Sequence, residues 1–266
     1  MLLASALLPG CSLATDLDEL GAGGAASGGS ATVSSSGAGA STATAGSSGG
    51  AGGSSGHGGA SSSGGGSGGM GGELVARFGE HDLADYKGVT TDAFVTLAEP
   101  GANYGSDDFI QIDADPANVG LMRFDVSALG ASVTVTGVEL HLGTAGDDSA
   151  GEVNFFEVLE AWDQGQGSGD PGACNWTDRK PGVAWATAGV GPGSRGMFSL
   201  GALSPVNAYA DYVVVLPPEL VQGWLADPDA NFGLALVTAS PDSVDLRASS
   251  HAQSGHRPML VVSYTE

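Results

Sequence analysis

Histidine, cysteine and carboxylate side chains occur along this sequence, but after residue 72 their spacing matches no familiar catalytic motif. That part contains no Gly-x-Ser-x-Gly nucleophile elbow, no His-Glu-x-x-His zinc pair and no Ser-x-x-Lys dyad. No motif places a base beside Cys174. His251 and His256 lie close together in the chain, but no nearby Cys or Glu completes a metal site. We therefore expect a protein that is not an enzyme.

Two acidic turns have the oxygen-rich composition of calcium sites. Asp227, Asp229 and Asn231 alternate along the chain, so three oxygen ligands could face one hard cation, although the following residues do not complete an EF-hand. A second acidic group surrounds the segment DFIQI and consists of Asp107, Asp108, Asp113 and Asp115. The alternative is a solvated edge in a very acidic domain, and for the second group the composition favours it. The cofactor that the sequence suggests is thus a structural calcium ion.

Aromatic side chains in or beside loops are candidates for stacking on sugar rings, because a flat ring packs against the apolar face of a sugar. The pair Arg179 and Lys180 is the only adjacent basic pair and suits a carboxylated sugar, although such pairs are more often solvated or paired with acids. The aromatic candidates are Tyr104, Trp185, Tyr209 and Tyr212, together with Tyr86.

Short β-strands separated by turn-forming residues must position these side chains. In the segment TVTGVELHL, Val138 and Leu140 share one face while Glu139 and His141 share the other. Similar segments are DAFVTL, DFIQI, LMRFDV, VNFFEVL, YVVVL, FGLALV, VDLRAS and MLVVSY, and their spacing is typical of an antiparallel β-sandwich. One short helix is expected after Pro217, with its apolar residues on one face, and it should end before Pro228.

The net charge excludes nucleic acid as a partner. The sequence of 266 residues has 8 Lys and Arg against 30 Asp and Glu, a formal charge of -22. Three acids precede residue 73, so the rest of the chain carries 27 acids and 8 bases, a net charge of -19. A duplex-binding surface needs clustered basic residues, and here they are scattered. High negative charge also favours a soluble monomer.

The N-terminal residues MLLASALLPGC end an apolar run in Leu-Pro-Gly-Cys, which resembles the lipobox of bacterial lipoproteins. The resemblance implies that Cys11 is lipidated, and the alternative is a free cysteine after a short apolar leader. Residues 12–72 are dominated by Gly, Ser, Ala and Thr, which cannot form a core, so they are predicted to be a disordered tether. Residues 21–72 would span roughly 40 Å as a coil. One folded domain is expected over 73–266, with the lipid as its only link to a membrane.

A series of segments in this domain occurs in a characteristic order. They read TTDAFV, ANYG, GLMRFDVSAL, VTGVELHL, VLEAW, CNWTDRKP, VQGWL, NFGLAL and SSHAQSGHRPMLVVSY. The order resembles that of the DNRLRE domain family over about residues 91 to 264. The resemblance implies a jelly-roll β-sandwich found on bacterial surface and secreted proteins, and some members are classed as carbohydrate-binding modules that recognise alginate. It also implies core positions for Trp162, Trp176 and Trp224.

These observations predict a non-catalytic lipoprotein of the bacterial cell envelope, anchored at the outer membrane or cell surface. Its extracellular β-sandwich is expected to bind a polysaccharide or cell-surface glycan. We expect the sugars to be neutral, because a domain with a net charge of -19 and eight cations repels a polyanion. One alternative is an adhesion or matrix protein that binds protein partners. Another is a polysaccharide lyase or hydrolase, for which the many acids offer no specific carboxylate pair.

Overall fold

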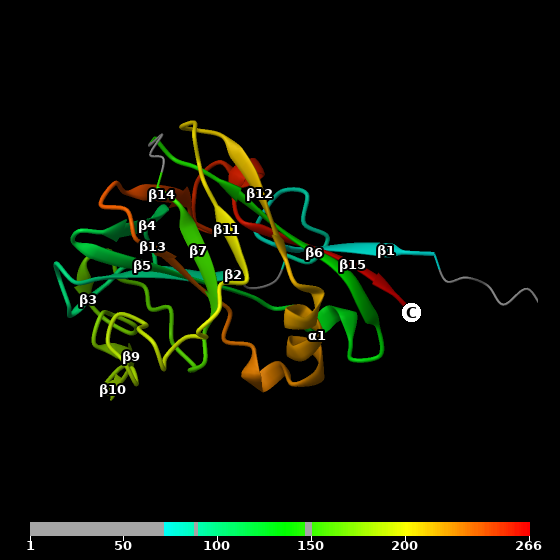
Figure 1. Ribbon diagram of the computed structural model, residues 1–266, viewed down its shortest axis with the longest axis horizontal. Coiled ribbons are helices and arrows are strands. Elements are labelled where there is room, and N and C mark those ends of the chain that lie inside the picture. The colour runs from blue at the N-terminus through cyan, green and yellow to red at the C-terminus, as the bar shows by residue number, and fades with distance from the viewer. Residues whose placement is uncertain (1–71, 88–89, 147–150) are drawn as a thin grey trace, which may run out of the picture. The chain divides into compact units, whose positions relative to one another are not determined.

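The computed structural model describes residues 72–87, 90–146 and 151–266. The predicted anchor at Cys11 and the predicted tether lie outside the described residues. Within the described part, the chain forms two curled antiparallel sheets with one short α-helix, as the sequence predicts (Figure 1). The fold is an all-β sandwich of the jelly-roll type.

The first sheet has four strands in the order β1 (Leu74–Gly79), β15 (Met259–Thr265), β6 (Thr134–Gly143) and β12 (Asp211–Leu216). Residues of β6 alternate as predicted, with Val138 and Leu140 buried while Glu139 is exposed. Strand β12 likewise buries Val214 and exposes Val215. One face of this sheet therefore packs on the core and the other faces solvent.

The second sheet runs in the order β11 (Gly201–Leu203), β7 (Val153–Glu157), β13 (Leu234–Thr238), β5 (Ala117–Phe124), β4 (Phe109–Ala114) and β14 (Val244–Arg247), with β2 (Thr90–Thr96) also paired to β5. Two short pairs accompany the sheets: β3 (Ala102–Asn103) with β8 (Asp170–Pro171), and β9 (Asp178–Lys180) with β10 (Val183–Ala184). All segments predicted as strands form strands. Strand β1 and the short β3 and β8–β11 were not predicted.

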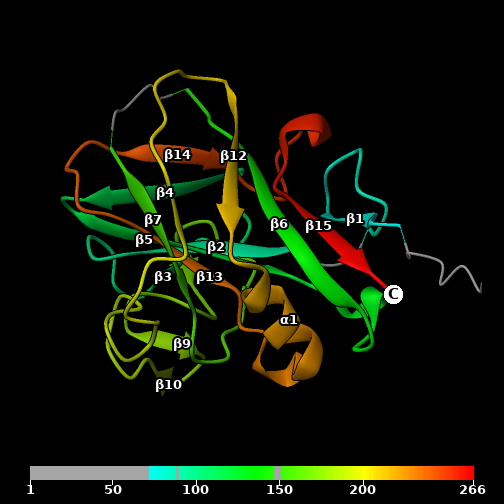
Figure 2. The same ribbon diagram turned by 45° about the vertical axis from the view of Figure 1, so that its right-hand side comes forward.

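Every residue of β2 is buried, because both faces of this strand are covered. Phe94 points into the main core between the sheets, whereas Ala93 and Val95 belong to a second apolar cluster. The second cluster includes Trp162 and Cys174 from the long segment that follows β7. This segment carries β8, β9 and β10 and packs on the outer side of the second sheet, at the end away from the C-terminus (Figures 1 and 2).

The helix α1 (Pro218–Ala226) begins with Pro218 and buries Leu220, Val221, Trp224 and Leu225 in the main core. It lies beside the start of β6, where Gln222 bonds the backbone of Val133 and Val135 (Figures 1 and 2). It ends at Ala226, with Asp227 as its C-cap, because Pro228 cannot continue the helical hydrogen bonding. Three short 3₁₀ turns complete the described elements: η1 (Ser127–Leu129), η2 (Pro228–Ala230) and η3 (Ser254–His256).

Candidate functional site

A hollow of about 390 Å³ opens beside the ends of β2, β4 and β5. Its wall combines a stacked pair of aromatic rings with carboxylate and amide side chains. The residues that matter for recognition are Phe94, Glu99, Tyr104, Asp107, Gln111 and Asn118. Two of them were candidates in the sequence analysis: Tyr104 for stacking on a sugar and Asp107 for binding calcium.

The Tyr104 side chain is fixed from two directions. Its ring stacks on Phe94 with the centroids 4.3 Å apart. Its hydroxyl donates a hydrogen bond of 2.6 Å to Glu99 Oε2. This bond, with smaller contributions from burial and from the charges of Glu99 and Asp107, raises the pKa of Tyr104 to about 12. The hydroxyl therefore stays protonated near neutral pH and holds the Glu99 carboxylate in the wall of the hollow.

The polar part of the wall offers groups that suit sugar hydroxyls. Asp107 accepts a hydrogen bond from Ser168 Oγ, while Gln111 is exposed on β4. Asn118 is only 9% exposed, and its Oδ1 is buried without a hydrogen-bond partner among the described residues. An unsatisfied buried amide is costly, so a hydroxyl donor or an ordered water at this point would be favourable.

The hollow is continuous with the outer face of β4 and β14. Gln111 lines the hollow, and Phe109 lies two residues earlier on the same face of β4. Phe109 is exposed and pairs directly with Arg247 of β14. The ring of His251 lies 5.4 Å from that of Phe109, and the ring of Tyr209 lies 5.9 Å from the Arg247 guanidinium. Aromatic side chains therefore follow this face from the hollow to Tyr209.

Several of these residues were missed in the sequence. The alternation in DFIQI places Phe109 and Gln111 on the outward face, so an aromatic ring on a polar face was the available signal for Phe109. Phe94 and Asn118 sit in segments that read as ordinary strands. Nothing in the sequence indicated Arg247.

The sequence prediction for Trp185 is wrong, because this side chain does not reach the surface. Trp185 is buried in the second apolar cluster, and its indole Nε1 donates a 2.9 Å hydrogen bond to the carbonyl of Asn175. Trp162 is buried in the same cluster and donates to the carbonyl of Phe232 at 2.8 Å. Each buried indole therefore has a carbonyl acceptor, Trp185 within its own loop segment and Trp162 in the turn before β13. The sequence did not predict that this loop segment covers the sheet.

Tyr212 is held by core packing and hydrogen bonds, so its ring is not available for stacking on a sugar. Its ring packs against the main core from β12. Its hydroxyl accepts hydrogen bonds from the amides of Val206 and Asn207, at 3.0 and 2.9 Å. Tyr212 therefore fixes the loop that carries Tyr209, whose own ring is exposed. The fifth loop aromatic, Tyr86, stacks on Phe78 with centroids 4.9 Å apart.

Arg179 and Lys180 are occupied by acids, which was the alternative interpretation of this pair. Arg179 Nε lies 3.4 Å from Glu160 Oε1, and its Nη1 donates a 2.6 Å bond to the carbonyl of Ala161. Lys180 Nζ lies 3.5 Å from Asp163 Oδ1. Both cations thus fasten β9 to the preceding segment.

The four aspartates around β4 do not converge on one point. Asp107 and Asp108 precede the strand, whereas Asp113 and Asp115 lie at its other end, roughly 17 Å away for an extended chain of this length. Asp113 Oδ1 accepts the amide of Asp115, which closes the turn into β5. These four candidates therefore do not form one calcium site, and the arrangement agrees with the solvated edge that the composition favoured. Within the described ranges, no three His, Cys, Asp or Glu side chains form a metal-holding group.

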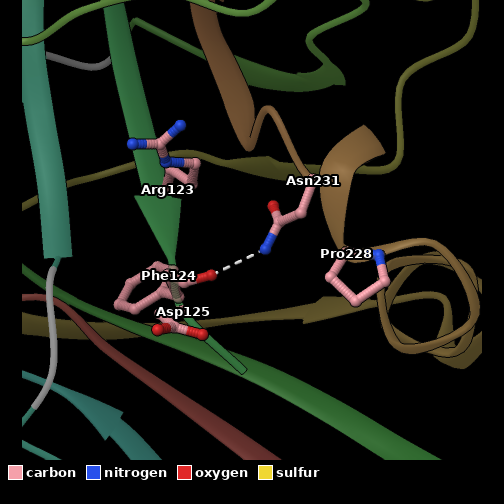
Figure 3. Close-up of a pocket in the computed structure, with 5 residues that line it drawn as sticks. All are labelled: Arg123, Phe124, Asp125, Pro228 and Asn231. Atoms are coloured by element: carbon pink, nitrogen blue, oxygen red, sulfur yellow. Dashed lines mark hydrogen bonds between the residues drawn. The ribbon is translucent and has the colours of Figure 1, made fainter. Parts of the chain in front are cut away.

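The turn with Asp227, Asp229 and Asn231 does not form a cage either. Asp227 ends α1 and Asp229 lies in η2, and both are exposed. Asn231 Nδ2 donates a 2.8 Å hydrogen bond to the carbonyl of Phe124 (Figure 3). The side chain of Asn231 thus lines a hollow of about 320 Å³ together with Arg123 and Asp125, without either aspartate of the predicted calcium turn.

Cys174 is unsuited to nucleophilic chemistry. The thiol is buried in the second apolar cluster. Burial raises the pKa of this thiol to about 12, and the nearby charge of Asp163 raises it further against a backbone hydrogen bond that lowers it. The thiolate is therefore essentially absent near neutral pH.

A third hollow, of about 450 Å³, lies on the solvent side of the first sheet. Three histidines line it, and each has an acid beside it. His141 Nε2 lies 3.2 Å from Glu139, His256 Nδ1 lies 2.9 Å from Asp211, and His81 Nδ1 lies 3.0 Å from Asp82. The third, His81, was not singled out in the sequence. His251 lies beside Phe109 and does not line this hollow.

No comparison with known proteins supports the resemblance to the DNRLRE family, which therefore depends on the quoted segments alone. No protein-family model matches the sequence, and no curated protein matches it. Among the described residues, no helix has the length and apolar character to span a bilayer.

Proposed function

We propose that this chain is a non-catalytic surface lipoprotein whose β-sandwich domain binds an extracellular or cell-wall polysaccharide at the Tyr104 hollow. The resemblance of the segments to the DNRLRE family supports this proposal, since it implies a carbohydrate-binding module. The lipobox-like sequence at Cys11 supports lipid anchoring in the bacterial cell envelope.

The composition of the hollow is the observation that carries the proposal. Sugar sites combine an apolar aromatic wall with a few polar groups that fix the hydroxyls. Here the stacked Phe94–Tyr104 pair supplies the apolar wall, and Glu99, Gln111 and Asn118 supply acceptors and donors. None of the lining side chains is a cation. A neutral sugar fits this wall better than an acidic one.

The proposal includes no catalytic step. Asp92 and Cys174 carry strongly shifted pKa values, but neither lines any of the three hollows described above. The two acids of the Tyr104 hollow are engaged, Glu99 by the Tyr104 hydroxyl and Asp107 by Ser168. Both carboxylates are therefore placed to accept hydrogen bonds in a fixed arrangement.

The test measures binding of the full chain to neutral polysaccharides by affinity electrophoresis in gels that contain xylan, mannan, galactan or β-glucan. Gln111→Ala removes an exposed side chain of the hollow without disturbing the core. We expect it to weaken retention by about fivefold to tenfold, as for loss of one or two hydrogen bonds. Gln166→Ala is the matched control, because Gln166 is exposed and does not line the hollow.

Equal retention of the Gln111→Ala and Gln166→Ala variants would place the sugar elsewhere. Absence of retention in every gel would contradict the proposed function. Tyr104→Phe adds a second measurement, since it keeps the ring against Phe94 and removes only the hydroxyl bond to Glu99.

A protein-binding adhesion or matrix component is the second candidate, and one observation favours it. Met197 and Phe198 are adjacent and 83% and 81% exposed. They protrude between Gly196 and Leu200, whose amides bond to the carbonyls of Glu157 and Phe155 on β7. Adjacent exposed apolar side chains of this size are typical of protein contact sites. Replacing both by Ser should abolish a protein contact and leave glycan retention unchanged.

A further inference from the structure

Arg247 is a buried cation in which two of the three guanidinium nitrogens lack hydrogen-bond partners. The residue ends β14 and is only 4% exposed. Its Nε and Nη1 atoms are buried and make no hydrogen bond in the described part of the protein. Together these two nitrogens carry three N–H groups that lack an acceptor.

Two other cations of the domain have an acid beside them. Arg77 is ion-paired with Asp85 at 3.3 Å, and Lys180 with Asp163 at 3.5 Å. Asp245 lies two residues before Arg247 on the same face of β14, but no hydrogen bond joins its carboxylate to Nε or Nη1. Buried N–H groups of a charged side chain are destabilising when they lack acceptors, so their presence in Arg247 points to a role other than folding.

The surroundings of Arg247 form a surface suited to a ligand. The ring of Tyr209 lies 5.9 Å from the guanidinium carbon and is 69% exposed. The backbone of Tyr209 has a φ of 53°, a conformation that non-glycine residues rarely adopt and that is common at binding sites. On the other side, exposed Phe109 pairs with Arg247 across the two strands.

We propose that Arg247, covered by the Tyr209 ring and flanked by Phe109, forms a subsite for one oxyanion group carried by an otherwise neutral ligand. A guanidinium binds a carboxylate, sulfate or phosphate through charge-assisted hydrogen bonds, and the three N–H groups of Nε and Nη1 await such an acceptor. Because Arg247 is only 4% exposed, binding of this group requires the exposed Tyr209 ring to move aside. The subsite extends the proposed function, because Gln111 joins this face to the Tyr104 hollow.

The rest of the domain limits the ligand to isolated oxyanions. A chain with a carboxylate on every sugar would bring many charges against a net charge of -19, whereas a single group pairs with Arg247 alone. The ligand class is therefore a mainly neutral glycan with an occasional acidic sugar or an ester of sulfate or phosphate.

The test titrates the full chain with glucuronate, inorganic sulfate, inorganic phosphate and, as the neutral control, glucose. Binding is followed by the Nε–H signal of Arg247 in nitrogen-15 NMR spectra. We expect at least one oxyanion to shift this signal with saturation, while glucose does not. Arg247→Gln should weaken that binding by at least about tenfold. The matched control Arg77→Gln should leave it unchanged. Comparison of the three oxyanions identifies the acidic group.

Equal binding of the oxyanions by wild type and by Arg247→Gln would show an adventitious ion only and overturn the proposal. An unshifted Arg247 Nε signal at saturating concentration of every probe would overturn it without any variant. If Arg247→Gln does not fold, oxyanion binding is compared between Tyr209→Phe and Tyr209→Leu. Tyr209 is exposed, and only the Phe variant keeps an aromatic ring over the guanidinium. The two proposals can be distinguished. If neutral polysaccharide gels retain the protein but the Arg247 Nε signal does not shift, the proposed function is supported and the oxyanion subsite is refuted.

Discussion

Asp92 is a buried carboxylate whose neutralisation should stabilise the protein. It lies in β2, and its Oδ2 accepts a 2.7 Å hydrogen bond from the amide of Ser249. Burial raises its pKa from 3.8 to about 6, against the hydrogen bonds from Ser249 and the charge of Arg257, which lower it. Asp92→Asn removes the charge and keeps an oxygen that accepts the Ser249 amide.

The pKa shift fixes the sign and size of the effect. Because the pKa of the folded state lies above that of the unfolded state, the native protein holds the Asp92 proton between pH 3.8 and about 6. Stability from this group is therefore present below pH 3.8 and is lost as the pH rises to about 6. A shift of this size corresponds to about 3 kcal/mol at pH 7. Asp92→Asn should remove this loss of stability at pH 7.

Urea denaturation of both proteins between pH 3.5 and 8 measures the difference in the free energy of unfolding. We expect nearly equal values at pH 3.5 and a variant that is more stable by about 3 kcal/mol at pH 7. The control is Asp125→Asn, because hydrogen bonds from Ser127 lower the pKa of Asp125 and its contribution is lost as the pH falls. That variant should be less stable at pH 7. A less stable Asp92→Asn variant with no pH dependence would refute the reasoning.

Three further predictions concern the anchor, the tether and the long loop. Cys11→Ser should move the protein from the detergent phase to the aqueous phase in a partition assay, and unchanged partitioning would exclude lipidation. Limited proteolysis should remove residues up to about 72 and leave a stable core, whereas unfolding on trimming would show that this segment packs. Asn103→Ala should lower stability by about 3 kcal/mol in thermal unfolding, because the buried amide bonds the carbonyls of Gln164 and Cys174 at 2.8 and 2.7 Å. A loss below about 1 kcal/mol would show that water replaces these bonds.

The strands could be predicted because their patterns are local. Alternation in β6 and β12 gives each residue a face directly, and Pro218 with Pro228 mark the limits of α1. The burial of β2 on both faces could not be predicted in this way. The burial of the outer face of β2 depends on a segment about 70 residues further along the chain. That segment is held in place by hydrogen bonds from Asn103 to the carbonyls of Gln164 and Cys174. Contacts over such separations leave no periodic pattern in the sequence.

The candidate site was less predictable than the fold, because exposure of a loop residue depends on what packs over it. Trp185 and Tyr104 both lie in or beside loops by sequence, yet Trp185 is buried under its own loop while Tyr104 lines a hollow. For Arg179 and Lys180 the sequence left open a carboxylated sugar or pairing with acids, and only the structure shows which acids lie beside them. Arg247 lies in a strand whose alternation gives no hint that its guanidinium lacks partners.

Calorimetric titration of the purified chain with neutral and uronate oligosaccharides, with calcium and with chelator, tests the central claim most directly. The account predicts binding of a neutral oligosaccharide that is unchanged by chelator, since no metal-holding group occurs among the described side chains. It predicts weak binding of a homopolymeric uronate, because the hollow at Tyr104 is lined by acids and amides rather than cations. Tight, calcium-independent binding of such a uronate, without binding of any neutral oligosaccharide, would contradict the account.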